Sequence, residues 1–260
     1  MTAPTARVRG RYAVEIGGRH VAPSVTGVLG ILDKPGLSWG AARETAIFAV
    51  LRRDQWEGLS EAEAIERLRK HHRGVWDDKA SRGTAVHALA HEWARGNEID
   101  VPPDCAPYID ALERFYLDWR PSWVALERSV VFSHPEWAYG GSFDAIGDLA
   151  DGKRWLLDVK TGSAVYPDTA LQLAAYRAAH AVGIYDALGN LVDTEPMPEV
   201  DATGVLHLRE DGGYSLIPMQ AGPDEFEFFL HARRLWAWGA ASKKVMGEPL
   251  AAPSREAVPV

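Results

Sequence analysis

Two carboxylates and a lysine occur in neighbouring segments near the middle of the chain. Asp144 lies in Gly-Gly-Ser-Phe-Asp-Ala-Ile-Gly, and Asp158 and Lys160 lie in Trp-Leu-Leu-Asp-Val-Lys-Thr-Gly. Residues two apart on a β-strand face the same side, so Asp158 and Lys160 must point together. If the two segments pair as an antiparallel hairpin, Asp144 comes beside Asp158. The spacing then predicts two carboxylates and an ammonium group on one face of a sheet.

Such a group suits hydrolysis of a phosphate ester assisted by a divalent metal ion. Two close carboxylates repel each other and stay ionised only if a cation lies between them. Hard oxygen ligands select Mg²⁺ or Mn²⁺. The ion can polarise a scissile phosphate and generate hydroxide from bound water. Lys160 could orient that water or offset charge on the phosphate.

An isolated Asp-x-Lys is more typical of a solvent-facing strand than of a catalytic site. Two features favour the site. Asp158 follows Trp-Leu-Leu, which predicts a buried strand where a charge needs a partner. Gly140, Gly141 and Gly147 surround Asp144, which indicates close approach of another backbone or of a ligand.

Hydrophobic periodicity, capping residues and turn residues predict the elements that hold these groups. Helices are predicted after Ser24 and over residues 38–53, 60–72, 77–95, 106–119, 167–181 and 226–242. Strands are predicted in a hairpin over 12–21, then over 123–132, 140–149 and 154–159, and in a last hairpin of 205–208 and 214–218. This order indicates an α/β fold with a small mixed sheet flanked by helices and preceded by a helical N-terminal portion.

The chain divides into three expected parts. Residues 1–75 form an N-terminal hairpin and helical portion packed on the core, residues 76–245 form the core, and residues 246–260 form a loose tail.

The composition restricts the class of protein. Cys105 is the only cysteine among 260 residues, which excludes an internal disulfide and sites built from several thiolates. The single cysteine indicates a reducing cytoplasm. Met1 to Arg11 lacks an apolar signal segment, and no apolar window reaches the length of a membrane span, so neither export by a signal nor a membrane span is expected. The net charge of −8 argues against indiscriminate coating of nucleic acid, but a nuclease can confine its basic residues to one face.

The ordered motifs resemble the PD-(D/E)XK nucleases, in the branch of RecB-type and CRISPR-associated exonucleases. Gly-Ser-Phe-Asp, Leu-Leu-Asp-Val-Lys-Thr-Gly and Gln172-x-x-x-Tyr176 carry the resemblance. Upstream, Arg82-Gly-Thr-Ala-Val-His87 is similar to the helical histidine motif of that group. The N-terminal Pro-Ser-Val-Thr-Gly-Val-Leu-Gly resembles phage-type exonucleases of this class. The likeness covers about residues 23–181, and its specificity lies in the ordered set.

The resemblance implies a restriction-endonuclease-like core and a role for each matching residue. Asp144 and Asp158 would be the main metal ligands, with His87 and the backbone carbonyl of Val159 as further ligands. Lys160 would be the catalytic lysine. The expected cofactor is Mg²⁺ or Mn²⁺.

Three further residues are implied to support the site. Gln172 and Tyr176, four apart on one helix face, would brace the site or contact DNA. Glu127 falls where the group commonly has a glutamate on its first core strand. The sequence departs from the group in having Asp-x-Lys where Glu-x-Lys is commoner. With one cysteine, no iron–sulfur cluster is expected.

The implied function is an exonuclease acting on DNA ends in recombination, repair or replication, in a bacterium or phage, with a possible recombination or replication partner protein. A catalytically silent DNA-binding or assembly subunit is the alternative. A zinc hydrolase using His87 and His91 is a third hypothesis, although the Glu of H-E-x-x-H is missing. The basic clusters at residues 67–73 and 233–234 could line a DNA groove or be solvated helix faces.

Overall fold

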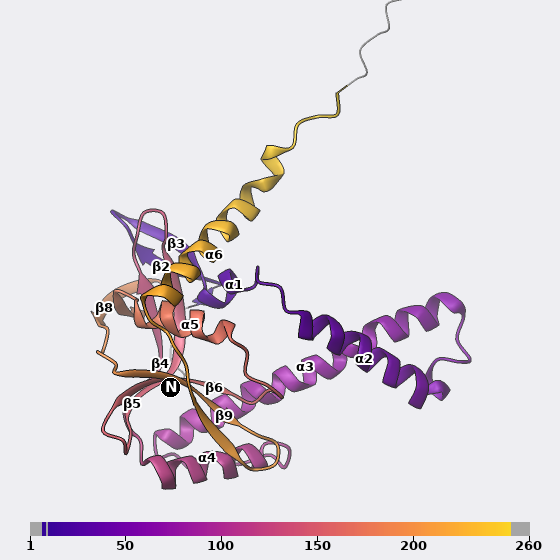
Figure 1. Ribbon diagram of the computed structural model, residues 1–260, viewed down its shortest axis with the longest axis horizontal. Helices are drawn as coiled ribbons and strands as arrows, with labels where there is room; N and C mark the ends of the chain where they lie inside the picture. The colour runs from indigo at the N-terminus through magenta and orange to yellow at the C-terminus, as the bar shows by residue number, and fades with distance from the viewer. Residues whose placement is uncertain (1–6, 9, 251–260) are drawn as a thin grey trace, which may run out of the picture.

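A seven-stranded mixed sheet forms the centre of the molecule, as the computed structural model of residues 7–8 and 10–250 shows (Figure 1). Its strand order is β10-β9-β6-β5-β4-β7-β8. Strands β6 and β9 run parallel, and the other neighbours are antiparallel. The predicted α/β fold with a mixed sheet is therefore confirmed.

The sheet is built from residues 122–218 of the chain. Its strands are β4 (Ser122–Phe132), β5 (Tyr139–Asp148), β6 (Arg154–Lys160), β7 (Ala181–Tyr185), β8 (Leu191–Pro196), β9 (Ala202–Leu208) and β10 (Tyr214–Pro218). A smaller sheet contains β1 (Arg7–Val8), β2 (Arg11–Glu15) and β3 (Arg19–Pro23).

Helices cover both faces of the large sheet. They are α1 (Val25–Leu29), α2 (Pro35–Leu51), α3 (Glu61–Ala94), α4 (Ala106–Trp119), α5 (Asp168–Arg177) and α6 (Pro223–Ala241), with single 3₁₀ turns at Arg53–Gln55 and Ser242–Val245. The C-terminal part of α3 and α4 pack on one face, and α1, α5 and α6 pack on the other. Successive strand residues alternate between the two faces. Leu156 packs with α1, α5 and α6, and Leu157 packs with α3 and α4.

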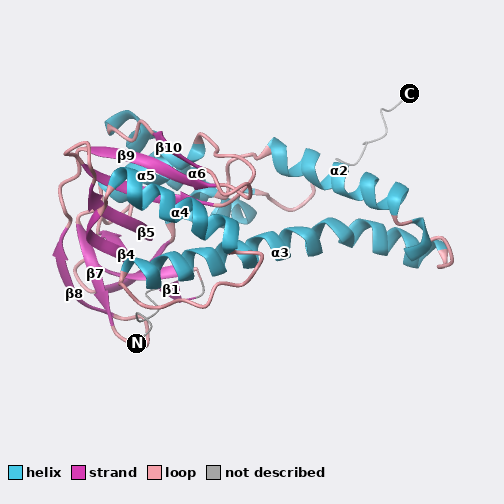
Figure 2. Cartoon of the chain, turned by 90° about the horizontal axis from the view of Figure 1, so that it is seen from below, coloured by secondary structure: helices cyan, strands magenta, loops and turns pink. Residues whose placement is uncertain are grey.

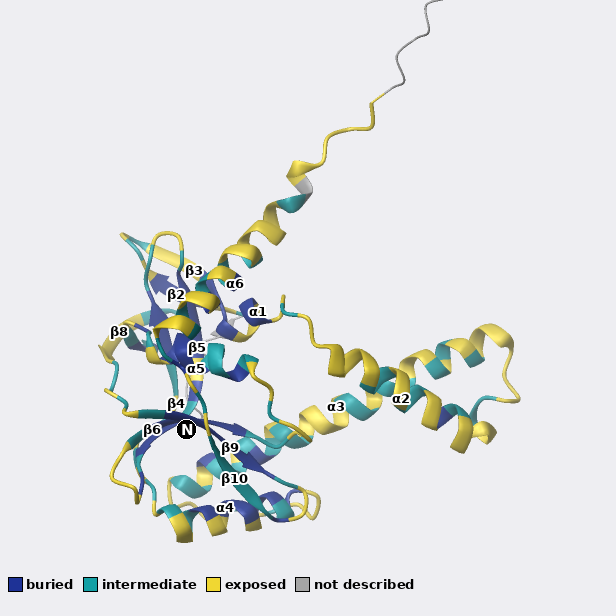
Figure 3. Ribbon diagram, viewed as in Figure 1, coloured by how far each residue is buried: buried dark blue, intermediate teal, exposed yellow. Residues whose placement is uncertain are grey.

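Helix α3 is one continuous helix of 34 residues. The prediction of separate helices over 60–72 and 77–95 is wrong, because residues 73–76 continue the helix and Gly74 is accommodated within it. The expected boundary between residues 75 and 76 falls inside α3. Helix α2 and the first half of α3 lie side by side and extend beyond the sheet (Figure 2), where most of their surface is exposed (Figure 3).

The N-terminal hairpin packs on the core. Tyr12 and Val14 of β2 are buried against Val131 of β4 and Tyr185 of β7. The predicted turn lies at Gly17 and Gly18, which have positive φ values of 60° and 141°. Such angles favour glycine over residues with a side chain.

The sequence analysis missed β7 and β8 and extended the preceding helix to residue 181, whereas α5 ends at Arg177. Strand β8 is the exposed edge of the sheet and has no alternation of apolar and polar residues, so no strand pattern marks it. Of the predicted tail, residues 246–250 form neither helix nor strand, and residues 251–260 lie outside the described residues. Within the described part of the chain, no helix is long and apolar enough to cross a membrane.

Candidate active site

The site lies where the two central strands β5 and β6 part. Their antiparallel pairing, on which the sequence argument depended, runs from Asp148 opposite Arg154 to Ala145 opposite Leu157 and then stops. The next residue of β5 is Asp144, whose carboxylate turns into the gap. Its Oδ2 accepts a hydrogen bond of 2.6 Å from the backbone N–H of Val159. The carboxylate thus replaces the strand partner that this buried amide would otherwise lack.

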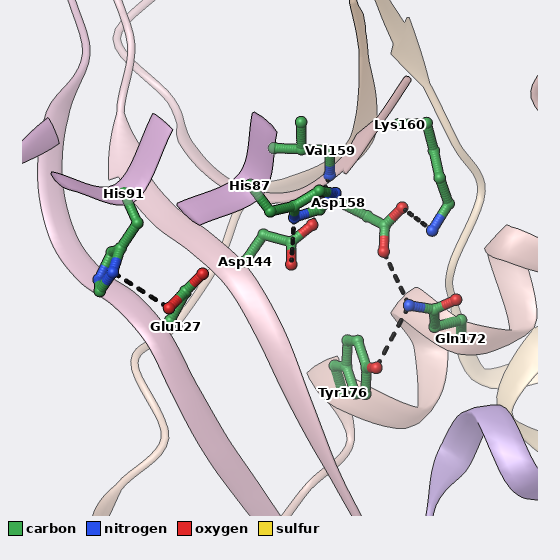
Figure 4. A network of polar contacts seen from close by, with 9 residues as sticks. All are labelled: His87, His91, Glu127, Asp144, Asp158, Val159, Lys160, Gln172 and Tyr176. Carbon is green, nitrogen blue, oxygen red and sulfur yellow. Dashed lines mark hydrogen bonds and ion pairs between the residues drawn. The ribbon is translucent and has the colours of Figure 1, made fainter. Parts of the chain in front are cut away.

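Asp158 and Lys160 point to the same side of β6, as their spacing predicts. Lys160 Nζ lies 2.8 Å from Asp158 Oδ2. From helix α5, Gln172 Nε2 donates a 2.7 Å hydrogen bond to Asp158 Oδ1 and lies 3.2 Å from the hydroxyl of Tyr176 (Figure 4). The i, i+4 spacing brings Gln172 and Tyr176 onto one face of α5 and toward Asp158.

The glycines near Asp144 make room for aromatic rings of the protein itself. A Cβ atom on Gly141 would lie 2.4 Å from the ring of Tyr176, and one on Gly140 would lie 2.4 Å from Tyr12. A Cβ on Gly147 would lie 2.5 Å from Trp123. The close approach predicted from these glycines is therefore made by buried side chains, and Gly141 lets Tyr176 reach its place below the site.

Helix α3 brings His87 over the carboxylate of Asp144. The two side chains approach to 3.5 Å between Nδ1 and Oδ1. One turn earlier, Gly83 passes close to Thr161 at the end of β6, where a Cβ atom would lie 3.1 Å from the threonine hydroxyl. This near contact sets the distance between α3 and the strand that carries Asp158 and Lys160.

A second histidine–carboxylate pair lies one helical turn further along α3. His91 Nδ1 is 3.1 Å from Glu127 Oε2 of β4, and Figure 4 shows this pair beside the His87–Asp144 pair. Glu127 has a positive φ of 45°, which is strained for a residue with a side chain. The flanking strand pairs place it opposite Asp144. His91 is buried, and its Nε2 has no hydrogen-bond partner among the described residues.

The charges around Asp144 favour its ionised form. Burial alone would raise the pKa of Asp144, but the contact and charge of His87, the amide of Val159 and the charge of Lys160 outweigh it and lower the pKa. Burial opposes protonation of His87, yet the contact with Asp144 and the charges of both aspartates raise its pKa. The pair therefore favours a carboxylate facing a protonated imidazole in the absence of another cation.

The pKa of Asp158 is shifted in the opposite direction from that of Asp144. Burial, followed by the charge of Asp144, raises its pKa to about 6, although Lys160 and His87 act in the other direction. Burial acts to lower the pKa of Lys160, but Asp158 and Asp144 outweigh it, so the pKa of Lys160 is raised and its ammonium form is favoured. The chain's own charges therefore leave an ionised Asp158 less stabilised than an exposed aspartate, and a further cation would offset this effect of burial.

A divalent cation fits this need. Oδ2 of Asp158 is buried and receives no hydrogen bond of acceptable geometry, so its contact with Lys160 is an ion pair only. Oxygen atoms of two carboxylates and a neighbouring imidazole nitrogen are donors that Mg²⁺ or Mn²⁺ accepts. Among the described residues, no three His, Cys, Asp or Glu side chains are already gathered as a metal centre. Binding would therefore require Asp144, Asp158 and His87 to exchange their present contacts for the ion.

The predicted site residues fall into two groups. Asp158, Lys160, Gln172 and Tyr176 form one connected set, and Asp144, His87 and the amide of Val159 form the adjoining set. Glu127 is set apart from them by its contact with His91. The sequence analysis considered His91 only as a zinc ligand beside His87 and missed its pairing with Glu127.

No protein-family model matches the chain, and comparison with curated proteins gave no match.

Proposed function

We propose that this chain is a nuclease that hydrolyses DNA phosphodiester bonds with the help of Mg²⁺ or Mn²⁺ and has a restriction-endonuclease-like core. The observation that carries the proposal is the convergence of Asp144, Asp158 and Lys160 where β5 and β6 part, with the buried Oδ2 of Asp158 contacted only by the ammonium group of Lys160. A buried Asp158 next to a partly buried Asp144 is costly to desolvate, and this cost supports a role for the pair in binding a cation.

In this proposal Asp144, Asp158 and His87 hold the ion, with the carbonyl of Val159 as a further ligand. The bound ion would supply Lewis-acid polarisation of the scissile phosphate and make water easier to deprotonate. The exposed side of the site leaves the phosphate room to approach, since the side chain of Lys160 is 37% exposed.

Lys160 acts on the substrate directly. Its Nζ, kept as an ammonium group by the two aspartates, can donate a hydrogen bond to the attacking water or to a non-bridging oxygen of the phosphate. Gln172 holds Asp158 in place through its 2.7 Å hydrogen bond, and Tyr176 orients Gln172. Both act as positioning residues on the rigid helix α5.

The resemblance of the motifs to RecB-type exonucleases supports action at DNA ends, in recombination, repair or replication. The mode of cleavage is tested by comparing end-labelled linear DNA with closed circular DNA, in Mg²⁺, Mn²⁺ or EDTA. Lys160→Ala is the test variant. Lys153→Ala is the matched control, because Lys153 is exposed in the turn that precedes β6.

Degradation of the linear DNA alone, abolished by EDTA and by Lys160→Ala but not by Lys153→Ala, is the expected result. Cleavage of the circle as well would make the enzyme an endonuclease. Binding of DNA without cleavage in any metal would overturn the enzymatic proposal and favour the DNA-binding subunit. Cleavage that survives magnesium chelation and is lost with a zinc-selective chelator would favour the zinc hydrolase.

A further inference from the structure

A polar pocket of about 320 Å³ lies beside the end of β6 that carries Lys160. The loop that directly follows Lys160 forms one wall, helix α3 forms another, and the end of β9 forms the third. The lining residues that matter here are Lys79, Arg82, Thr161, Ser163, Arg209 and Glu210. The catalytic chemistry described above uses none of them.

Arg82 is the cation best placed to bind a ligand in this pocket. Its Cζ lies 5.8 Å from the centroid of the Tyr108 ring, a cation–π contact that favours this position of the guanidinium group. No carboxylate of the described residues forms an ion pair with Arg82 or with Lys79, which lies three residues earlier on α3. An oriented guanidinium group without a counter-ion is suited to bidentate binding of a phosphate.

The other charges of the pocket leave an excess of positive charge. Arg209 is partly neutralised, because its Nε lies 3.3 Å from Asp211 Oδ1. Asp211 and Glu210 are the two carboxylates of the lining, against the three cations Lys79, Arg82 and Arg209. In a chain with a net charge of −8, this local excess is the opposite of the overall balance.

The loop wall is held in place by the buried His207 of β9. Its Nε2 lies 2.7 Å from the carbonyl oxygen of Gly162, and since a carbonyl only accepts, Nε2 carries the hydrogen. On the opposite wall, Gly83 allows α3 to approach Thr161 closely. The pocket therefore has two walls fixed relative to each other and to Lys160.

The pocket lies within reach of a second phosphate of a strand cleaved at the site. Arg82 precedes His87 by five residues, an offset of about 7.5 Å along the helix axis. Thr161 and Gly162, the two residues that follow Lys160, line the same pocket. A strand whose scissile phosphate meets Lys160 can thus place a neighbouring phosphate against Arg82.

We propose that this pocket binds a phosphate group of the DNA strand next to the scissile phosphate, with Arg82 as the main ligand and Lys79 as the second. The inference rests on the proposed nuclease function and adds a substrate-binding subsite to it. The phosphate can be an internal diester or a terminal monoester, since both offer the same oxygen atoms to the guanidinium group.

The test compares wild type with Arg82→Ala, Arg82→Lys and Lys79→Ala on a labelled oligonucleotide, over a range of salt concentrations. Arg114→Ala is the matched control, because Arg114 is an exposed arginine of α4 that lies outside the pocket and outside the basic clusters at 67–73 and 233–234. For each alanine variant of the pocket, the slope of log(kcat/KM) against log[salt] should be less negative than that of wild type by about 0.7–0.9, the value for one lost phosphate contact. Arg82→Ala should also lower kcat/KM by about tenfold at low salt, which corresponds to one charge-assisted contact.

The kcat/KM of Arg82→Lys should lie between those of wild type and Arg82→Ala, because lysine keeps the charge but lacks the planar guanidinium group. Lys79→Ala, at an exposed helix position, should lower kcat/KM a few-fold without affecting folding. A wild-type salt slope and kcat/KM in both alanine variants would overturn the proposal. A thermal unfolding curve for each variant separates loss of binding from loss of structure.

Two further arms complete the experiment. Oligonucleotides with and without a 5′-phosphate, and with and without a 3′-phosphate, identify which phosphate the pocket binds. An effect of Arg82→Ala that is restricted to one phosphorylated end assigns a terminal monoester. An equal effect on all the oligonucleotides assigns an internal diester. Fluorescence anisotropy measures DNA binding independently of cleavage. Weaker binding by Arg82→Ala with no cleavage by wild type would uphold the subsite while overturning the nuclease function.

Discussion

The backbone amide of Val159 donates its hydrogen bond to the side chain of Asp144 rather than to a neighbouring strand. The carboxylate therefore has two functions: it completes the hydrogen bonding of a buried strand end, and it presents its other oxygen to His87. Stability and the proposed metal binding would thus depend on the same side chain but on different properties of it.

Substitution can separate these two functions. Asp144→Ala should lower the free energy of unfolding by about 1–3 kcal/mol, because the Val159 amide loses its partner. Asp144→Asn keeps an acceptor oxygen and should remain near wild-type stability while losing Mn²⁺ binding. Urea unfolding in EDTA and calorimetric titration with Mn²⁺ measure the two effects. Asp110→Asn, at an exposed position of α4, is the control. Equal stability of the Ala and Asn variants would contradict the expectation.

Asp158→Asn should stabilise the metal-free protein. The pKa of Asp158 is raised to about 6 from an ordinary 3.8, chiefly by burial, so the folded protein binds this proton more tightly than the unfolded chain. Stability from this group is therefore present at low pH and is lost as the pH rises through 6. At pH 7.5 the neutral Asn should raise the free energy of unfolding by about 1–3 kcal/mol.

Thermal unfolding in EDTA at two pH values tests this prediction. The gain from Asp158→Asn should shrink at pH 5, where the wild-type carboxyl group is largely protonated. Mn²⁺ should stabilise the wild type and not the variant. A variant that is less stable than the wild type at pH 7.5 would show that the contacts with Lys160 and Gln172 outweigh the burial of the charge.

The two histidines of α3 should differ in their effect on metal binding. His87 approaches Asp144, whereas His91 is engaged with Glu127. His87→Gln should therefore weaken Mn²⁺ binding at least tenfold, and His91→Gln by less than about threefold. Calorimetry with Mn²⁺ and with Zn²⁺ measures both. Equal losses for the two variants, with tight Zn²⁺ binding by the wild type, would support the zinc hydrolase instead.

Gly141→Ala should disturb the site through Tyr176. The added Cβ would lie 2.4 Å from the tyrosine ring, so the ring and the attached Gln172 must shift. A loss of about 1–3 kcal/mol in the free energy of unfolding is expected, with a fall in kcat. Gly74→Ala is the matched control: it lies within α3 with no atom within 4 Å and should stabilise the protein by about 0.5–1 kcal/mol. Unchanged kcat in Gly141→Ala would show that Tyr176 does not position the site.

The local pattern of the sequence determined which residues could act together on one element. The alternation along β6 places Asp158 and Lys160 on one side, and the four-residue spacing on α5 places Gln172 and Tyr176 on one face. Apolar runs and turn residues likewise predicted most of the strands, whereas the antiparallel pairing of β5 with β6 entered the sequence argument only as a condition. These features depend on residues close in sequence, whose geometry follows from the backbone periodicity.

Only the tertiary structure decided how these elements meet. The parting of β5 and β6, the parallel placement of β9 beside β6, and the addition of β7 and β8 depend on packing between segments distant in sequence. The same is true of the histidines: their spacing puts His87 and His91 on one face of α3, but the position of the helix over the sheet assigns one to Asp144 and the other to Glu127. A local pattern sets the direction of a side chain along its own element, whereas the partner it reaches depends on how two hydrophobic faces pack together.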